Sequence, residues 1–199
     1  MNLLNLYKDL DPTERFVVET FEVQNYNPVR PQLTIIDGGA YQGEFSFYCL
    51  PFAKKIYAFE PDPRPFNRMN DLINQHGLGD IIKHYPIALA GTNGYRYLHN
   101  SGYGGSVMLG ETVTQPGGSV RVETITLAKL FEDEKIKQVD ILKLDMEEAE
   151  EEVLKIPEFP ELSKRIKMII GEHLRTSEGL LESLGYKKET YKENSVFTK

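Results

Sequence analysis

Acidic side chains stand where the predicted strands of this chain end. Asp37, Glu60, Asp145 and Glu172 each follow an apolar run, and Ala88 lies near a further strand end. In an α/β protein the ligand binds outside the carboxyl ends of the parallel strands, so we expect these residues to face a common cleft. Carboxylates in a cleft can accept hydrogen bonds from hydroxyl groups or remove protons.

The first strand end is followed by a glycine-rich turn. The stretch LTIIDGGAYQG, residues 33–43, places Asp37 directly before Gly38, Gly39 and Gly43. Glycine allows positive φ and a close approach of backbone to ligand. A dinucleotide-binding turn reads G-x-G-x-x-G without an acid directly ahead of it, so Asp37 favours a ligand with an ammonium or sulfonium group. The alternative is an ordinary strand-to-helix turn.

The second strand end carries Glu60 in the stretch IYAFEPDP. It lies roughly 20 residues beyond the glycine turn, where an acidic side chain can accept both hydroxyl groups of an adenosine ribose. The alternative is a solvated strand terminus. The two motifs at this spacing indicate a nucleoside-containing ligand.

The stretch 145–153 is acidic, since six of its nine residues are Asp or Glu. A helix that begins near Met146 would place an apolar face on the sheet. The opposite face would carry carboxylates in contact with solvent, and these are Glu148, Glu151 and Glu152.

The same helical geometry places Glu150 among apolar residues. A buried carboxylate is costly unless it is hydrogen-bonded or paired, so we expect Lys143 or backbone N–H groups to be its partner. Asp145 ends the strand and Glu147 begins the helix, so both are predicted to point into the cleft.

The remaining pattern predicts a doubly wound, mostly parallel seven-stranded α/β sheet of the Rossmann-like type, closed by a C-terminal antiparallel strand. Residues 1–30 read as a helical segment and linker, and 31–199 as a single domain with a β-rich insert at about 91–130. We expect helices after Gly43 and in three further ranges, 65–77, 146–156 and 178–185. Strands are expected at 33–37, 55–60, 80–89, 139–145 and 167–174, followed by a hairpin of 186–191 and 195–199.

Composition limits the partners. The chain has 199 residues and a formal net charge of −7, which disfavours nucleic acid and favours small or neutral substrates. The single cysteine, Cys49, excludes an intrachain disulfide and is predicted to be buried. No apolar stretch reaches membrane-spanning length, and no leader pattern precedes the fold, so we expect a soluble cytoplasmic protein. The sequence indicates no oligomeric state.

Four motifs in order, DGGAYQG, FEPDP, VDILKLDMEEAE and IIGEHL, resemble the FkbM-type family of S-adenosylmethionine-dependent methyltransferases over about residues 33–199. The resemblance implies a class I methyltransferase fold, S-adenosylmethionine as cofactor, and methyl transfer to a hydroxyl group of a sugar or other small natural product. It also implies a set of cofactor-binding positions. These are Asp37, Gly39 and Gly43 around the methionine part, Glu60 at the ribose, and Pro61 and Asp62 at the adenine edge. Gly38, Ala40 and Ala88 complete the predicted cofactor-binding set.

The chain departs from this family at three positions, and the first is Gly38, which stands where a small aliphatic residue is common. Tyr41 stands where relatives usually have asparagine, and Glu148 replaces the glycine of the pattern K-x-D-x-E-G-x-E. The changes at Gly38 and Tyr41 remove neither the acid nor the outer glycines of the first turn.

For methyl transfer we expect Asp145 or His173 to act as general base, with Glu147 and Lys143 as orienting groups. A nicotinamide-dependent oxidoreductase and a non-catalytic cofactor-binding module are alternatives. A metal-assisted enzyme is another, because Asp145, Glu147 and Glu172 offer hard oxygen ligands for Mg²⁺ or Ca²⁺. No metal site is predicted.

Overall fold

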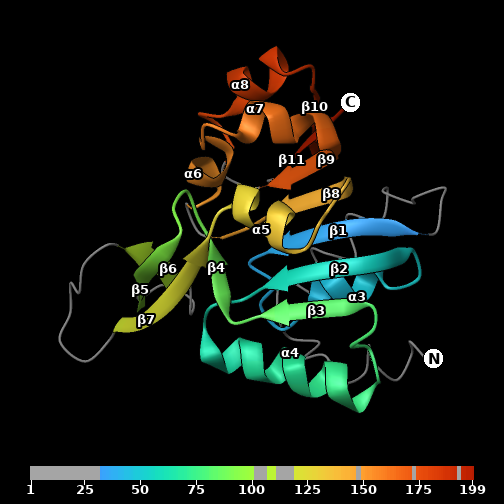
Figure 1. Cartoon of the computed structure of the whole chain (residues 1–199), viewed down its shortest axis with the longest axis vertical. Coiled ribbons are helices and arrows are strands. Elements are labelled where there is room, and N and C mark those ends of the chain that lie inside the picture. The colour runs from blue at the N-terminus through green and yellow to red at the C-terminus, as the bar shows by residue number, and fades with distance from the viewer. Residues whose placement is uncertain (1–31, 101–106, 111–118, 147–148, 172–173, 192–193) are drawn as a thin grey trace.

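The fold is built around one seven-stranded sheet. The computed structural model describes residues 32–100, 107–110, 119–146, 149–171, 174–191 and 194–199, so the predicted helix and linker at 1–30 lie outside the described residues. The strands lie in the order β10-β11-β9-β8-β1-β2-β3 (Figure 1). The five strands from β9 to β3 are mutually parallel, and β11 runs antiparallel to β9. The predicted doubly wound, mostly parallel sheet is confirmed.

Strands and helices alternate along the chain. The first half contains β1 (Leu33–Gly38), α3 (Glu44–Cys49), β2 (Ala53–Phe59), α4 (Pro63–Gln75) and β3 (Ile82–Tyr85). The second half contains α5 (Leu127–Asp133), β8 (Val139–Leu144), α6 (Glu150–Leu154), α7 (Phe159–Leu162), a 3-10 turn (Ser163–Arg165), β9 (Ile166–Gly171), α8 (Glu178–Ser183), β10 (Lys187–Tyr191) and β11 (Asn194–Thr198). Helices α5 and α7 are additional to the predicted ones. In the described part of the chain, no helix has the length and apolar character needed to cross a bilayer.

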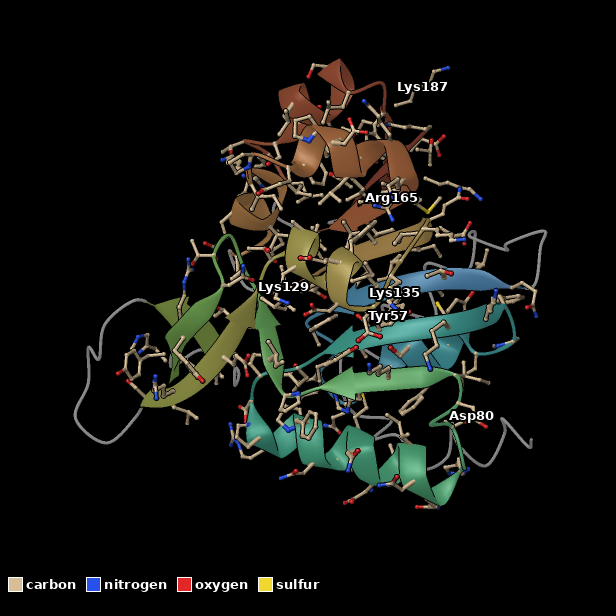
Figure 2. All side chains as sticks on the ribbon, viewed as in Figure 1. Tyr57, Asp80, Lys129, Lys135, Arg165 and Lys187 are labelled. Carbon is tan, nitrogen blue, oxygen red and sulfur yellow. The ribbon has the colours of Figure 1, made fainter. Side chains whose placement is uncertain are left out.

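The sheet separates two apolar layers, because successive side chains of a strand point to opposite faces. Ile35 faces the layer that α3 and α4 cover, and its neighbour Ile36 faces the layer that α5, α6, α7 and α8 cover. Arg165, labelled in Figure 2, lies over the ring of Phe131 at 4.8 Å and so joins the 3-10 turn to α5. Cys49 is buried in the first layer, as predicted.

The predicted third strand, residues 80–89, divides at Pro86. β3 stays in the main sheet, whereas β4 (Ile87–Leu89) pairs in parallel with β7 (Ser119–Ile125). Proline has no backbone N–H to donate to a ladder, which explains why the pairing changes there. With β5 (Gly94–Asn100) and β6 (Val107–Gly110), these strands form a second sheet in the order β4-β7-β5-β6.

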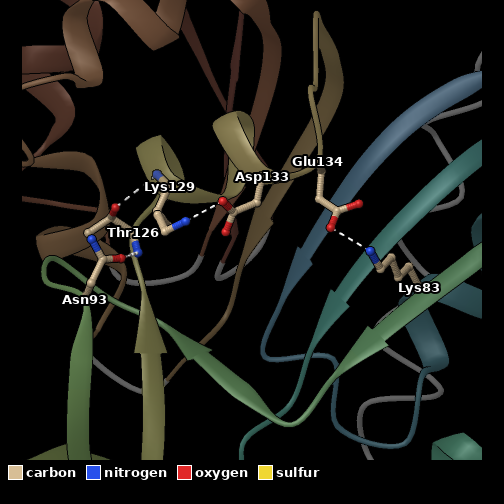
Figure 3. Close-up of polar contacts among 6 residues, drawn as sticks. All are labelled: Lys83, Asn93, Thr126, Lys129, Asp133 and Glu134. Atoms are coloured by element: carbon tan, nitrogen blue, oxygen red, sulfur yellow. Dashed lines mark hydrogen bonds and ion pairs between the residues drawn. The ribbon is translucent and has the colours of Figure 1, made fainter.

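Polar contacts join the second sheet to the main core (Figure 3). The Asn93 side-chain oxygen accepts a hydrogen bond from the Thr126 N–H at 2.8 Å, and the Thr126 hydroxyl caps α5 by accepting from the Lys129 N–H at 3.2 Å. Lys83 of β3 pairs with Glu134, just after α5, at 2.6 Å. The second sheet lies on the side to which the arrowheads of β2 and β3 point (Figure 1), so it stands beside the carboxyl ends of these strands.

The acidic segment forms a shorter helix than predicted. α6 begins at Glu150, four residues after Met146. Glu152 forms an ion pair with Arg96 of β5 at 2.7 Å and thereby links α6 to the second sheet. The prediction of a solvated Glu152 is therefore wrong.

Glu151 is also held by protein groups, so its predicted solvation is wrong too. Its Oε1 accepts hydrogen bonds from the N–H groups of Thr176 (2.6 Å) and Ser177 (3.1 Å), and Lys155 lies 2.9 Å from its Oε2. Burial alone would raise the pKa of Glu151, but the hydrogen bonds from Ser177 and Thr176 lower it to about 2. The third predicted solvent-facing residue, Glu148, lies outside the described residues.

We predict that Glu151→Ala lowers the free energy of unfolding by about 2 kcal/mol, because it leaves the turn before α8 without its acceptor. Urea unfolding at pH 7 measures this. The folded pKa lies below the ordinary value of 4.5, so the contribution is present above pH 4.5 and is lost as the pH falls toward 2. The control is Glu158→Ala at an exposed position. Equal losses in both variants would contradict the assignment.

Candidate functional site

The site lies where the strand order of the main sheet reverses. From β1 the chain proceeds outward through β2 and β3, and it then returns to β8 on the other side of β1. In such sheets the ligand binds in the crevice outside the carboxyl ends of the two central strands. Here those ends are joined directly, because the Asp145 N–H donates to the Gly38 carbonyl at 3.1 Å.

Gly39 allows the two strand ends to approach each other. Its φ is +73°, and a Cβ atom at this position would lie 1.8 Å from the Asp145 carbonyl oxygen. The N–H groups of Gly39 and Ala40 both donate to the Phe59 carbonyl, at 3.0 and 2.9 Å. Any side chain at residue 39 would therefore force β1 and β8 apart.

Lys143 carries a largely buried ammonium group at the centre of the site, with 13% of its side chain exposed. Its Nζ lies 2.7 Å from the Gly39 carbonyl oxygen, 3.3 Å from Asp37 Oδ1 and 3.6 Å from Asp145 Oδ2. Burial alone would lower the pKa of Lys143, but the Asp37 and Asp145 carboxylates raise it above its ordinary value. Lys143 therefore stays protonated at neutral pH and cannot serve as a base.

Asp37 is enclosed on all sides. It is 0% exposed, and its Oδ2 accepts a hydrogen bond from the Ser46 hydroxyl of α3 at 2.6 Å. In the sheet it stands directly opposite Lys143, because β1 and β8 are paired in that register. Ser46 was not predicted as a site residue, and no local motif marks it.

Glu60 is the buried carboxylate at the end of β2. One of its oxygens accepts from the Tyr41 N–H at 2.9 Å, and the other accepts from the Asp62 N–H at 2.8 Å. Burial raises the pKa of Glu60 to about 7, although these two hydrogen bonds act in the opposite direction. Each oxygen keeps lone-pair capacity for a further donor.

Tyr41 adopts the left-handed conformation, with φ +49°. Asparagine and glycine enter this region more readily than tyrosine does. Tyr41 pays this conformational cost while its N–H binds Glu60. Gly43 also has positive φ, +96°, and a Cβ there would lie 2.6 Å from the ring of Phe47.

The other predicted cofactor positions lie in the glycine turn, at the start of α4 and in β4. A Cβ at Gly38 would lie 2.9 Å from Met146 Sδ, so the turn after β8 packs on the glycine turn. Asp62 accepts a hydrogen bond from the Arg64 N–H at 2.9 Å and so caps α4, with Pro61 between it and Glu60. Ala88 is buried in β4 of the second sheet, beside Leu98 and Val122. The site residues assigned from sequence stay predictions.

Glu150 is fully buried, as the helical pattern predicted. Its Oε1 accepts a hydrogen bond from the Met146 N–H at 2.6 Å, which confirms the expected backbone partner. Among the described residues, Lys143 does not pair with it, and its Oε2 has no hydrogen-bond partner. Glu147, Glu172 and His173 lie outside the described residues.

Metal ligands do not gather in the described part of the chain. Within those residues, no three His, Cys, Asp or Glu side chains are placed to hold an ion. Of the three proposed oxygen ligands, only Asp145 lies among the described residues, because Glu147 and Glu172 lie outside them. The metal-assisted alternative therefore stays a hypothesis.

Solved structures identify the fold. The chain is similar to the METTL16 methyltransferase domain (14% identity, TM-score 0.53, covering 95% of this chain and 70% of that chain). It is also similar to a precorrin-6y methyltransferase from Geobacter metallireducens (13%, 0.52, 96% and 92%). A third match is TrmK of M. capricolum, solved with S-adenosylhomocysteine (11%, 0.50, 93% and 66%). The fold is that of the class I methyltransferases, which use S-adenosylmethionine.

The family follows from a profile match. The methyltransferase FkbM domain matches residues 37–187, and the chain belongs to this family. The protein is thus an S-adenosylmethionine-dependent methyltransferase, as the resemblance implied. A comparison with curated protein sequences finds no match. The family match gives no support to the nicotinamide-dependent alternative.

We predict that, without ligand, the free energy of unfolding of the Glu60→Gln variant increases relative to that of wild type as the pH rises. The folded pKa of Glu60, about 7, exceeds the ordinary value of 4.5, so its protonated form stabilises the fold at low pH and the contribution is lost toward pH 7. Between pH 5 and pH 8.5 the stability of the variant relative to wild type should gain on the order of 2 kcal/mol.

Urea unfolding at the two pH values measures this difference. The control is Glu151→Gln. The pKa of Glu151 in wild type, about 2, lies below both pH values, so the difference in free energy of unfolding between this variant and wild type should stay nearly constant. A difference for Glu60→Gln that is the same at both pH values would show that burial does not perturb this carboxyl group.

Proposed function

We propose that the protein transfers a methyl group from S-adenosylmethionine to a hydroxyl group of a small molecule, such as a sugar or another natural product. The observation that carries the proposal is the FkbM domain match together with the organised crevice at Gly39, Lys143 and Asp145. Bound S-adenosylmethionine supplies a methyl group activated by its sulfonium centre.

The cofactor-binding assignment fits the residues present. Glu60 has acceptor capacity on both oxygens beyond its two backbone hydrogen bonds, which suits the two hydroxyl groups of a ribose. Gly38 and Gly39 lack side chains where Met146 and the Asp145 carbonyl pack against them, so the ends of β1 and β8 lie close together at the cofactor position. Pro61 and Ala88 would border the adenine.

Alignment is the main contribution the chain can make to such a displacement. Correct orientation of two reactants is worth about 7–11 kcal/mol in the best intramolecular models, and a general base adds typically about 10²–10⁴-fold. Because Lys143 stays protonated, it can orient groups but cannot accept the proton. Asp145 and His173 are the proposed bases.

The second sheet offers a surface for the acceptor beside the strand ends (Figure 1). Tyr95, Tyr97 and His99 alternate along β5 and so share one face. The Arg121 guanidinium lies 3.8 Å from the ring centre of Tyr95, which is 60% exposed. Aromatic rings with hydrogen-bonding groups suit a sugar ring. The net charge of −7 disfavours a nucleic acid or an anionic membrane surface.

We predict that label from methyl-tritiated S-adenosylmethionine passes to mono- and disaccharides and other hydroxylated small molecules as a methyl ether that survives mild alkali. The measurement compares these acceptors with RNA and with peptides, each with and without a chelator. Transfer that persists in the chelator would remove the metal-assisted alternative. Transfer to RNA or peptide alone would refute the proposed acceptor class, and cofactor binding without any transfer would favour the non-catalytic module.

A further inference from the structure

The ends of β1 and β8 carry two carboxylates, Asp37 and Asp145, which differ in their exposure and in their hydrogen-bond partners. Asp37 is 0% exposed, and its two oxygens face Ser46 (2.6 Å) and the Lys143 ammonium (3.3 Å). The negative charge of Asp37 is thus compensated by the Lys143 ammonium inside the protein. A cationic ligand group cannot reach it without displacing Lys143.

Lys143 also occupies the nearby Gly39 carbonyl, at 2.7 Å. A carbonyl at the end of β1 is one place where a ligand ammonium could donate a hydrogen bond. The internal ammonium of Lys143 already donates to this acceptor, so a second cation at the same carbonyl would meet a like charge.

Asp145 differs from Asp37 in exposure and in partners. Its side chain is 29% exposed, and one oxygen, Oδ2, lies 3.6 Å from Lys143. Its other oxygen, Oδ1, makes no hydrogen bond or ion pair to the described residues. Its backbone N–H is bonded to Gly38 at 3.1 Å, which fixes it beside the glycine turn.

We propose that Asp145 binds the ammonium group of the methionine part of S-adenosylmethionine, in the role that the sequence pattern gives to Asp37. The arrangement favours this, since two carboxylates at these strand ends face a single internal ammonium, Lys143. A hydrogen bond between an ammonium and a carboxylate is charge-assisted and therefore strong. Lys143 holds the Asp145 carboxylate in place for it.

This assignment removes Asp145 from the two candidate bases. An Asp145 side chain that binds the cofactor is engaged there, so we assign removal of the acceptor hydroxyl proton to the other candidate base, His173. The inference rests on the cofactor and not on the acceptor, so binding measured without any acceptor tests it independently of the proposed reaction.

Calorimetry with two ligands is the test. S-Adenosylhomocysteine carries the ammonium group, and its deamino analogue lacks that group alone. Asp145→Asn should weaken S-adenosylhomocysteine about 10- to 100-fold, and it should change binding of the deamino analogue by less than about threefold. This split distinguishes a direct contact from a general loss of structure.

The matched control is Asp140→Asn on the same strand. Asp140 also pairs with a lysine, Lys167, at 2.6 Å, but it stands at the opposite end of β8. The Asp140→Asn variant should bind both ligands with affinities within about threefold of those of wild type. Equal weakening of both ligands by Asp145→Asn, or unchanged affinity for S-adenosylhomocysteine, would overturn the proposal.

Discussion

The buried ammonium of Lys143 is the interaction on which the crevice depends. Removing an ammonium from water is costly unless opposite charge and hydrogen-bond acceptors replace the solvent. Asp37, Asp145 and the Gly39 carbonyl supply them, and they come from the ends of two strands that are distant in sequence. The pairing of β1 with β8 places Asp37 opposite Lys143, so the register of the sheet and the geometry of the crevice support each other.

Two features near the crevice reduce the stability of the fold, as is common for residues of a binding site. Tyr41 is held at positive φ, and Glu60 is a buried carboxyl group whose pKa is raised to about 7. Such costs gather at functional sites, where the surrounding structure maintains them. Here the support comes from outside the crevice, where Glu151 holds the turn before α8 and the pair of Arg96 with Glu152 attaches the second sheet to α6.

The sheet could be read from the sequence because its strands have strong local signals. The alternating apolar runs, the glycine turn after Asp37 and the closing hairpin are all found where expected. The division at Pro86 carried a visible signal, since proline interrupts a ladder. Helix α5 carried another, because Thr126 caps a segment with apolar residues at helical spacing.

The partners of the acidic residues could not be read in the same way. Helical periodicity placed Glu151 and Glu152 in solvent, but their partners lie on β5 and before α8, at sequence distances that no local pattern encodes. For the same reason, the sequence does not reveal that Asp37 contacts Ser46 and pairs with Lys143. The acidic residues at the strand ends could therefore be found from the sequence, whereas the contacts that distinguish Asp37 from Asp145 required the tertiary structure.

The coupling free energy between Asp37 and Lys143 tests most directly whether the buried ammonium organises the crevice. It is obtained from urea unfolding of wild type, Asp37→Asn, Lys143→Met and the double variant. Each single change leaves an unpaired group in a buried site, so we predict single losses of about 3–5 kcal/mol and a coupling of at least about 2 kcal/mol. Additive losses, with a coupling below about 0.5 kcal/mol, would show that the two strand ends are held together by something other than this ion pair.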